Sequence, residues 1–177
     1  MSQIVQGFHG TSREVAELIL NNGAQYFQLS QNEYDWLGDG VYFWENNLTR
    51  AMTWAKQHFQ DEAAVLEATI SLADCMDLTD DYWKQRLAEA YVSLKVVYRR
   101  LKKRLPKQTA LRHDRDKVVI EHLIEQLWMN GKSIRCVRGS FDEGRRIFPL
   151  SAIRRQSHIQ IAVRDTSLIT NLRIHTA

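Results

Sequence analysis

The sequence has little cysteine and no long apolar run. Cys75 and Cys136 are the only cysteines among 177 residues, and neither lies in a metal-binding spacing or close to a histidine in the sequence. A disulfide framework is therefore excluded as the basis of the fold, and a reducing compartment is favoured. No segment approaches the roughly 18 apolar residues of a transmembrane helix, and the N-terminus lacks the basic and apolar regions of a signal peptide. We expect a cytoplasmic protein with no membrane or metal partner.

Over most of the chain neither sign of charge predominates. The 24 basic and 21 acidic residues leave a net charge of only +3, and the hydrophobic content of 44% is ordinary for a globular protein. The exception is a basic run without any acid, which contains Arg99, Arg100, Lys102, Lys103, Arg104 and Lys107. Such a run can contact the phosphates of RNA or DNA. It can equally be the solvated C-terminal end of a helix, where cations oppose the dipole favourably.

The spacing of apolar residues predicts an α+β fold in a single domain over residues 1–177. We expect strands at about residues 3–8, 41–44, 65–72, 133–138, 159–164 and 168–174. We expect helices at about residues 12–22, 47–60, 83–101 and 114–130. The strands are dispersed around the helices without a regular alternation of strand and helix, which is typical of α+β proteins.

The middle of the chain differs from both ends. Residues from about 79 to 131 show the apolar spacing of two amphipathic helices, which end near Pro106 and Gly131. We expect Trp128 on the inner face of the second helix. Two helices alone could scarcely bury a core, so we interpret this segment as a helical insertion in the domain.

Two short segments lie where the backbone can meet a ligand. Thr11 begins a capping box as the N-cap of the first helix, which puts His9 and Gly10 at a strand-to-helix junction with free backbone groups. Farther along, Gly38 and Gly40 form a tight turn, in which glycine tolerates positive φ. The strand after this turn is rich in aromatic residues, which either line a pocket or belong to the core.

A long loop is expected from residue 139 to residue 157, and a structureless stretch of this length is usually functional. Its basic residues are Arg145, Arg146, Arg154 and Arg155. These arginines suit a nucleic-acid partner, although arginines on loops also commonly bind the diphosphate of a nucleotide, or nothing.

The segments Phe8-His9-Gly10-Thr11 and Leu37-Gly38-Asp39-Gly40-Val41-Tyr42-Phe43 resemble the opening of the diphtheria-toxin-type ADP-ribosyltransferases, which include the poly(ADP-ribose) polymerases. The third family element is a strand that begins with glutamate. The segment Gln160-Ile161-Ala162-Val163-Arg164-Asp165 is similar to it, with Gln160 in the position of the glutamate. The resemblance covers the two ends of the chain and not the helical middle. It implies an ADP-ribosyltransferase-like split β-sheet core with a two-helix insertion.

The resemblance also implies NAD as the co-substrate, bound without a metal. His9 would hydrogen-bond a hydroxyl of the adenosine-side ribose, and the backbone of Gly10 would pair with the nicotinamide carboxamide. Thr11 completes this motif. Tyr42 would stack on the nicotinamide ring, and Trp54 on the next helix would supply an opposing wall.

Gln160 is the important departure from the family pattern. An amide accepts the same hydrogen bond as a carboxylate but carries no charge and is no useful base. The resemblance therefore implies transfer of a single ADP-ribose, or lost activity, and argues against polymer synthesis. Glu143 would restore a carboxylate if its loop folds over the site; otherwise it is a solvated turn residue.

The expected function is that of an NAD-dependent mono-ADP-ribosyltransferase with a macromolecular acceptor, RNA or DNA slightly favoured over protein. Compact transferases of this kind resemble bacterial toxins of toxin–antitoxin or phage-defence systems, so an antitoxin is a possible partner. Two alternatives remain open. One is an NAD-dependent RNA 2′-phosphotransferase, in which Arg13 or Arg50 would grip the RNA phosphate. The other is an inactive domain that binds NAD, ADP-ribose or nucleic acid.

Overall fold

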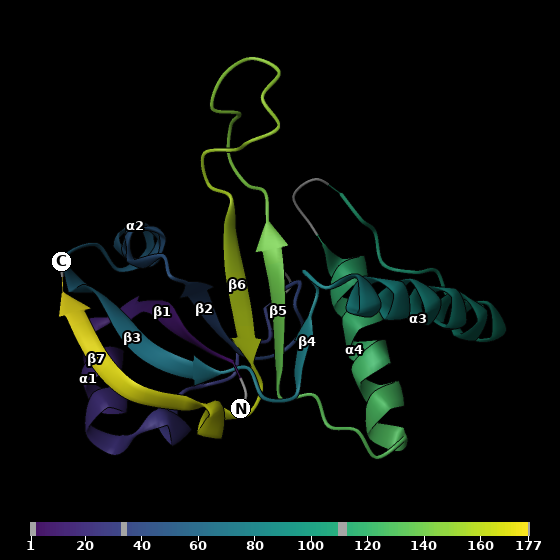
Figure 1. Ribbon diagram of the computed structural model, residues 1–177, viewed down its shortest axis with the longest axis horizontal. Helices are drawn as coiled ribbons and strands as arrows, with labels where there is room; N and C mark the ends of the chain where they lie inside the picture. The colour runs from purple at the N-terminus through teal and green to yellow at the C-terminus, as the bar shows by residue number, and fades with distance from the viewer. Residues whose placement is uncertain (1–2, 33–34, 110–112, 177) are drawn as a thin grey trace.

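The computed structural model describes residues 3–32, 35–109 and 113–176, and its strands form one mixed sheet of seven strands in the order β4-β5-β6-β2-β1-β3-β7 (Figure 1). The strands are β1 (Ile4–Ser12), β2 (Val41–Glu45), β3 (Ala63–Ser71), β4 (Cys75–Asp77), β5 (Cys136–Phe141), β6 (His158–Val163) and β7 (Ile169–Thr176). The α-helices are α1 (Arg13–Asn22), α2 (Leu48–Phe59), α3 (Asp81–Arg100) and α4 (Asp114–Met129). The predicted α+β class is confirmed.

The sheet is weakly joined at its centre. β1 pairs with β3 along all nine of its residues, whereas it pairs with β2 only at Gly7↔Glu45 and Phe8↔Trp44. Beyond Phe8 and Trp44 the two strands part. On the far side of this division β2 pairs with β6, and β6 pairs with β5, both antiparallel.

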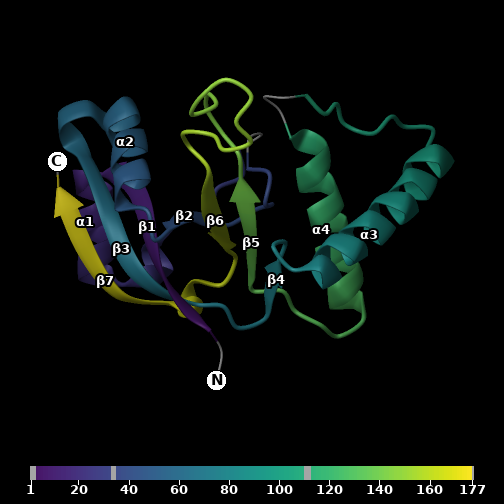
Figure 2. The same cartoon turned by 45° about the horizontal axis from the view of Figure 1, so that its top comes forward.

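Helices α1 and α2 cover opposite faces of the β1–β3–β7 part of the sheet (Figure 2). Leu66 of β3 packs in the same core cluster as Ile19 of α1, whereas its neighbour Val65 packs with Ala51 and Ala55 of α2. Successive side chains of a strand point to opposite faces, so both faces of β3 are buried. The predicted strand at about residues 65–72 is thus buried on both faces at its start, at Val65 and Leu66.

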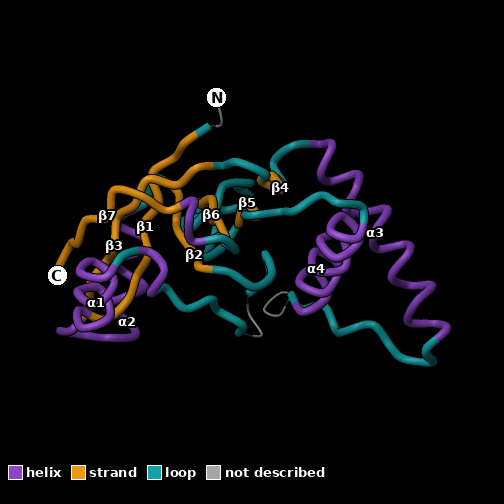
Figure 3. The backbone as a smooth tube through the Cα atoms, turned by 90° about the horizontal axis from the view of Figure 1, so that it is seen from below, coloured by secondary structure: helices purple, strands orange, loops and turns teal. Residues whose placement is uncertain are grey.

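Helices α3 and α4 lie side by side beyond the β4 edge of the sheet (Figure 3). They share a core cluster with the inner residues of that edge, including Met76 and Val137. Leu123 and Leu127 of α4 are buried there, but Trp128 is 70% exposed, which contradicts its predicted inward position. Each residue advances by about 100° around a helix, so the residue after the buried Leu127 is turned away from the core.

Pairing with β3 continues farther along β1 than the sequence indicates. Thr11 pairs with Ala64 inside the strand, so the expected N-cap at Thr11 is wrong. Ser12 is the N-cap of α1, and its Oγ accepts a hydrogen bond from the Val15 N–H at 3.4 Å. His9 and Gly10 therefore lie within β1 and not in a junction.

Other differences concern short elements. β4 has only three residues and was not predicted, because three residues carry no periodic signal. β5 begins at Cys136 and not at residue 133, and because it ends at Phe141 and not at residue 138, the loop before β6 is shorter than predicted. In the glycine turn only Gly38 has a positive φ, of 88°, whereas Gly40 forms a β-bridge with Ser30.

An ion-pair network spans the β4 side of the sheet. Arg138 of β5 donates to Glu45 at 2.6 Å and 2.9 Å and to Asp77 at 2.8 Å, so one guanidinium links β2, β5 and β4. The Arg138 and Glu45 side chains are only 12% and 9% exposed. Removing either side chain would therefore leave the other charge buried without a partner, which destabilises the folded protein.

We expect Arg138→Met to lower the free energy of unfolding by about 3 kcal/mol, because it leaves two carboxylates without their cation in a largely buried place. Urea unfolding at neutral pH measures this change. The control is Lys84→Met, which breaks an exposed ion pair with Asp81 and should change stability by less than about 1 kcal/mol. Equal effects of the two substitutions would contradict the assigned role of Arg138.

Candidate functional site

A cavity of about 930 Å³ lies where β1 and β2 part. Its walls come from β1, β2, β6, the start of α2, the loop before β2 and the loop after β5. The residues that the sequence singled out and that line this cavity are His9, Gly10, Tyr42, Trp54, Glu143 and Gln160. Thr11 does not line it, because its backbone is held in the pairing with β3 and its side chain is buried.

The His9 imidazole bridges the division in the sheet. Its Nδ1 lies 2.9 Å from the carbonyl oxygen of Tyr42. A carbonyl only accepts, so Nδ1 carries the proton and the neutral ring presents Nε2 as an acceptor. The ring packs edge-on against Phe27, with centroids 5.3 Å apart. Burial lowers the pKa of His9 and outweighs the hydrogen bond to Tyr42, which favours the charged form.

Gly10 presents its backbone at the same place. The Gln6 carbonyl accepts from the Asn46 N–H at 2.9 Å on the β2 side. Backbone groups of every second strand residue face the same edge, so the N–H and C=O of Gly10 also face β2. Continuing the β1–β2 register would pair Gly10 with Tyr42, but the described residues show no such pair. The imidazole of His9 has taken the Tyr42 carbonyl, and the Gly10 backbone is left facing the cavity.

A side chain at residue 10 would not fit. A Cβ on Gly10 would lie 2.9 Å from the Ala51 carbonyl oxygen and 3.0 Å from Cε3 of Trp54. Helix α2 therefore approaches β1 as closely as glycine permits, and the Trp54 ring lies directly beside the Gly10 backbone.

Two hydrogen bonds hold the hydroxyl of Tyr42. Its hydroxyl accepts from the Leu37 N–H at 3.1 Å and donates to the Gly38 carbonyl at 2.8 Å. Burial, reinforced by the charge of Asp35, raises the pKa of Tyr42 far above its usual range. The side chain is therefore a neutral phenol that attaches the glycine turn to β2, while its ring lines the cavity.

Gln160 lies opposite Trp44 in the β2–β6 register, on the same face of the sheet as Tyr42. Its Nε2 lies 2.9 Å from Nε2 of His158. The Nδ1 of His158 lies 2.5 Å from the Gln156 carbonyl and must donate, so its Nε2 accepts from the Gln160 amide. The amide nitrogen of Gln160 is thereby engaged, and its Oε1 is the atom left to accept a hydrogen bond from a ligand.

A charged pair lies across the cavity wall. Nη2 of Arg50, near the start of α2, is 3.0 Å from Oε2 of Glu143, in the loop after β5. The guanidinium lies 5.8 Å from the centroid of the Trp44 ring. Arg50 Nε and Trp44 Nε1 are buried and have no hydrogen-bond partner in the described part of the chain. Sequence reasoning named Arg50 only as an alternative phosphate ligand, because its pairing with Glu143 spans two distant segments.

The cavity has an aromatic wall that sequence reasoning did not assign to the site. The Trp36 ring stacks on His113 at 4.2 Å between centroids and meets Phe141 edge-on at 3.7 Å. Trp36 and His113 both line the cavity. The position of Trp36 beside the glycine turn was a usable signal, whereas nothing in the sequence placed the start of α4 next to it.

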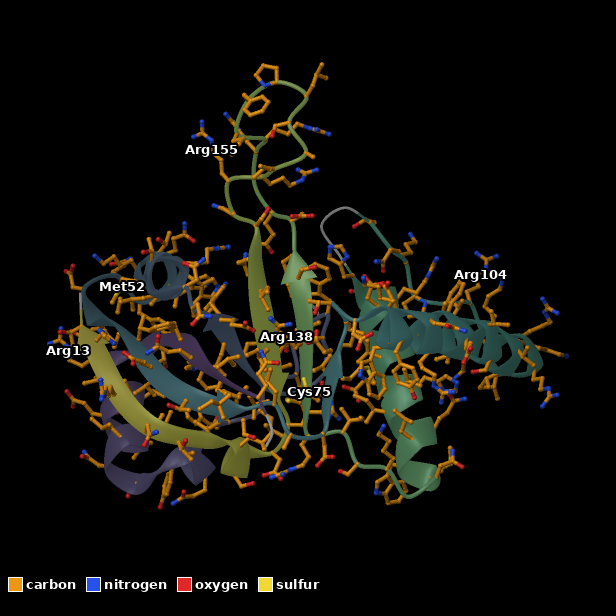
Figure 4. All side chains as sticks on the ribbon, viewed as in Figure 1. Arg13, Met52, Cys75, Arg104, Arg138 and Arg155 are labelled. Carbon is orange, nitrogen blue, oxygen red and sulfur yellow. The ribbon has the colours of Figure 1, made fainter. Side chains whose placement is uncertain are left out.

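The basic run lies elsewhere. Arg99 and Arg100 belong to the last turn of α3, and Lys102, Lys103 and Arg104 follow it as exposed residues. Arg104 lies beside α3, well away from Arg155 on the loop between β5 and β6 (Figure 4). None of these five residues lines the cavity.

Comparisons with family models, with curated proteins and with solved structures found no match. No helix in the described residues is long and apolar enough to span a bilayer. Within the same residues no three side chains of histidine, cysteine, aspartate or glutamate are grouped to hold a metal ion.

We expect His9 to stay neutral, with the proton on Nδ1, well below pH 6.5. NMR of the ring nitrogens should show this tautomer, and the Cε1 proton shift should titrate below the value of an unstructured histidine, about 6.5. The lowered pKa of His9 means that the unfolded chain binds the proton first, so stability falls as the pH drops below about 6.5. A titration midpoint at or above 6.5 would contradict the buried, neutral state.

Proposed function

We propose that the protein is an NAD-dependent mono-ADP-ribosyltransferase, built on the split-sheet arrangement of the diphtheria-toxin-type transferases. The supporting observation is that the parting of β1 and β2 opens a cavity of about 930 Å³ lined by His9, Tyr42 and Gln160. This volume lies in the range of sites for cofactor-sized ligands. The three residues come from both ends of the chain, as the resemblance requires.

The nicotinamide end of NAD fits the walls around Gly10. The free N–H and C=O of Gly10 match the acceptor and donor of a planar carboxamide. The rings of Tyr42 and Trp54 line the same cavity and offer apolar surface to an aromatic ring. The hydrogen bonds of the Tyr42 hydroxyl to the glycine turn hold its ring still, which favours a fixed geometry of the bond that breaks.

The ribose next to the nicotinamide bears several hydroxyl donors. Gln160 Oε1 is left by its other hydrogen bond as an acceptor for these hydroxyls, and His9 Nε2 is likewise left as an acceptor for the adenosine-side ribose. Cleavage of the nicotinamide–ribose bond passes through an oxocarbenium-like state, as in glycoside hydrolysis. Ribose hydroxyls become more acidic as positive charge develops, so acceptors at these positions bind the transition state more strongly than the ground state.

Glu143 supplies the carboxylate that Gln160 does not. In the transfer, a nucleophile of the acceptor bonds to the anomeric carbon as the bond to the nicotinamide nitrogen breaks. Nicotinamide leaves as a neutral molecule, and the proton of the nucleophile passes to Glu143. Arg50 holds this side chain at the cavity wall, 3.0 Å from Nη2. A single carboxylate on a loop suits one transfer to an external acceptor better than repeated elongation of a chain.

The RNA 2′-phosphotransferase alternative has less support. It requires basic residues to grip a phosphate, and of Arg13 and Arg50 only Arg50 lines the cavity, where it is paired with Glu143. The alternative of an inactive binding domain differs from the proposal only in turnover, so the same assay separates them.

We expect the protein to release nicotinamide from labelled NAD in the presence of cell extract and to label a macromolecule. His9→Ala should reduce the rate roughly 10- to 100-fold, because it removes one hydrogen bond to the ribose and frees the Tyr42 carbonyl. Chromatography of nicotinamide measures the rate.

The control for this substitution is His122→Ala, which removes a histidine that bonds Ser93 at 2.9 Å outside the cavity and should leave the rate unchanged. Calorimetry that detects NAD binding without any nicotinamide release would reject the transferase in favour of the inactive domain.

A separate prediction concerns Glu143 as the general base. Glu143→Gln should lower transfer roughly 100-fold or more, because the amide cannot take the proton of the acceptor. NAD affinity should change by much less, which calorimetry measures. The matched control is Glu89→Gln, a carboxylate that pairs with Arg86 at 3.5 Å on α3. Full activity of Glu143→Gln would show that the carboxylate plays no part in the reaction.

A further inference from the structure

The loop of residues 142–157, between β5 and β6, projects from the sheet (Figures 1 and 2). Its two sides are joined by backbone hydrogen bonds, from Ile147 N–H to the Ile153 carbonyl at 3.2 Å and from Arg155 N–H to the Arg145 carbonyl at 2.9 Å. The loop therefore has a defined shape, and its base is continuous with the cavity through Glu143 and Arg154.

The projecting loop is strongly basic. Its residues from 144 to 157 include four arginines and no acid. Arg146 donates to the Ser151 carbonyl, and Arg154 donates to the Gly144 carbonyl at 3.0 Å. Arg145 and Arg155 are exposed, and their side chains make no ion pair or hydrogen bond within the described residues.

The two acids at the base of the loop offset only part of its charge. Asp142 accepts from Ser157 Oγ at 2.7 Å, and Glu143 is paired with Arg50. The positive field of the loop is thus open to a partner, and a polyanion is the partner that it attracts.

The loop also exposes apolar side chains at its tip. Phe148 is 60% exposed, Leu150 is 93% exposed and Ile153 is 60% exposed. An exposed aromatic ring together with unpaired arginines is a combination that binds single-stranded nucleic acids. The bases stack on the ring, and the phosphates bind the cations.

We propose that the projecting loop binds a single-stranded nucleic acid and presents it as the acceptor of ADP-ribose. Arg145 and Arg155 contact phosphates, Phe148 stacks on a base, and a neighbouring unpaired nucleotide enters the cavity past Arg154. This inference rests on the proposed function, because it names the substrate class of that site. A duplex would have to extrude its base first, at a cost in unstacking energy.

The basic run after α3 is a weaker candidate for the same role. It lies beside α3 and lines no part of the cavity, and Arg104 is well separated from Arg155 (Figure 4). A strand bound only there would not be directed toward the reacting ribose. It therefore provides a matched control of similar charge.

The first test is fluorescence anisotropy of the full chain with labelled single strands of RNA and of DNA, each about 20 nucleotides long, at several salt concentrations and without NAD. We expect binding to at least one of them, and the tighter of the two identifies the sugar. Arg145→Ala with Arg155→Ala should weaken binding at least about tenfold and reduce the salt slope by roughly 2. Phe148→Ala should weaken it by about tenfold.

The control is Lys102→Ala with Lys103→Ala, which removes the same charge from the basic run and should change affinity by less than about threefold. Circular dichroism of all variants checks that they are folded. Loss of binding in this control with no loss in the loop variants would overturn the proposal. So would binding to phosphatidylserine vesicles, reduced by the loop variants, with no binding to either single strand.

The second test separates the acceptor from the reaction. Labelled NAD is incubated with protein and the bound strand, and the label is followed through nuclease and protease treatment. Label that nuclease removes supports the proposal. Nicotinamide release with label that only protease removes would overturn the acceptor class and leave the transferase standing. Loop-dependent binding of the strand with no nicotinamide release under any condition would instead overturn the transferase.

Discussion

One hydrogen bond decides where the sheet opens. The register of β1 and β2 would make Gly10 and Tyr42 the next pair after Phe8 and Trp44, yet the Tyr42 carbonyl accepts from Nδ1 of His9 at 2.9 Å. A side chain has replaced a backbone donor, so the strands part without leaving the carbonyl unsatisfied. The same substitution leaves the Gly10 backbone facing the cavity and fixes the proton of His9 on Nδ1. The parting, the exposed amide and the acceptor nitrogen therefore share one cause.

The second constraint comes from α4, part of the predicted helical insertion, which holds the glycine turn. Glu121 of α4 accepts from the Asp39 N–H at 2.8 Å and from Arg164 at 2.7 Å, and Lys117 pairs with Asp39 at 2.8 Å. Gly38 has a φ of 88°, which favours glycine, and a Cβ there would also lie 2.3 Å from the Glu121 carboxylate. The insertion is thus part of the site's framework, and the cavity shape depends on its docking.

The sequence was informative where chemistry and local pattern coincide, and it failed where long-range pairing decides. His9, Tyr42 and Gln160 were chosen through the resemblance to the ADP-ribosyltransferases, and all three line one cavity. The N-cap at Thr11 was wrong because pairing with β3 extends β1 past the capping motif. The pair between Arg50 and Glu143 could not be inferred, since the residues are 93 positions apart and meet only when α2 and the β5–β6 loop are folded.

Under the proposed function, the charges of the cavity bear on how a single transfer is separated from repeated transfer. His9 and Tyr42 are both held neutral by burial, and Gln160 is neutral by composition, so none of these three residues brings a negative charge to the cavity. A permanent carboxylate there would stabilise the oxocarbenium-like state before an acceptor arrives and so promote hydrolysis by water. The carboxylate lies instead on Glu143 at the base of the projecting loop, where Arg50 holds it at the cavity wall. In the proposed reaction an acceptor bound to the loop lies next to this carboxylate, which couples cleavage to acceptor binding.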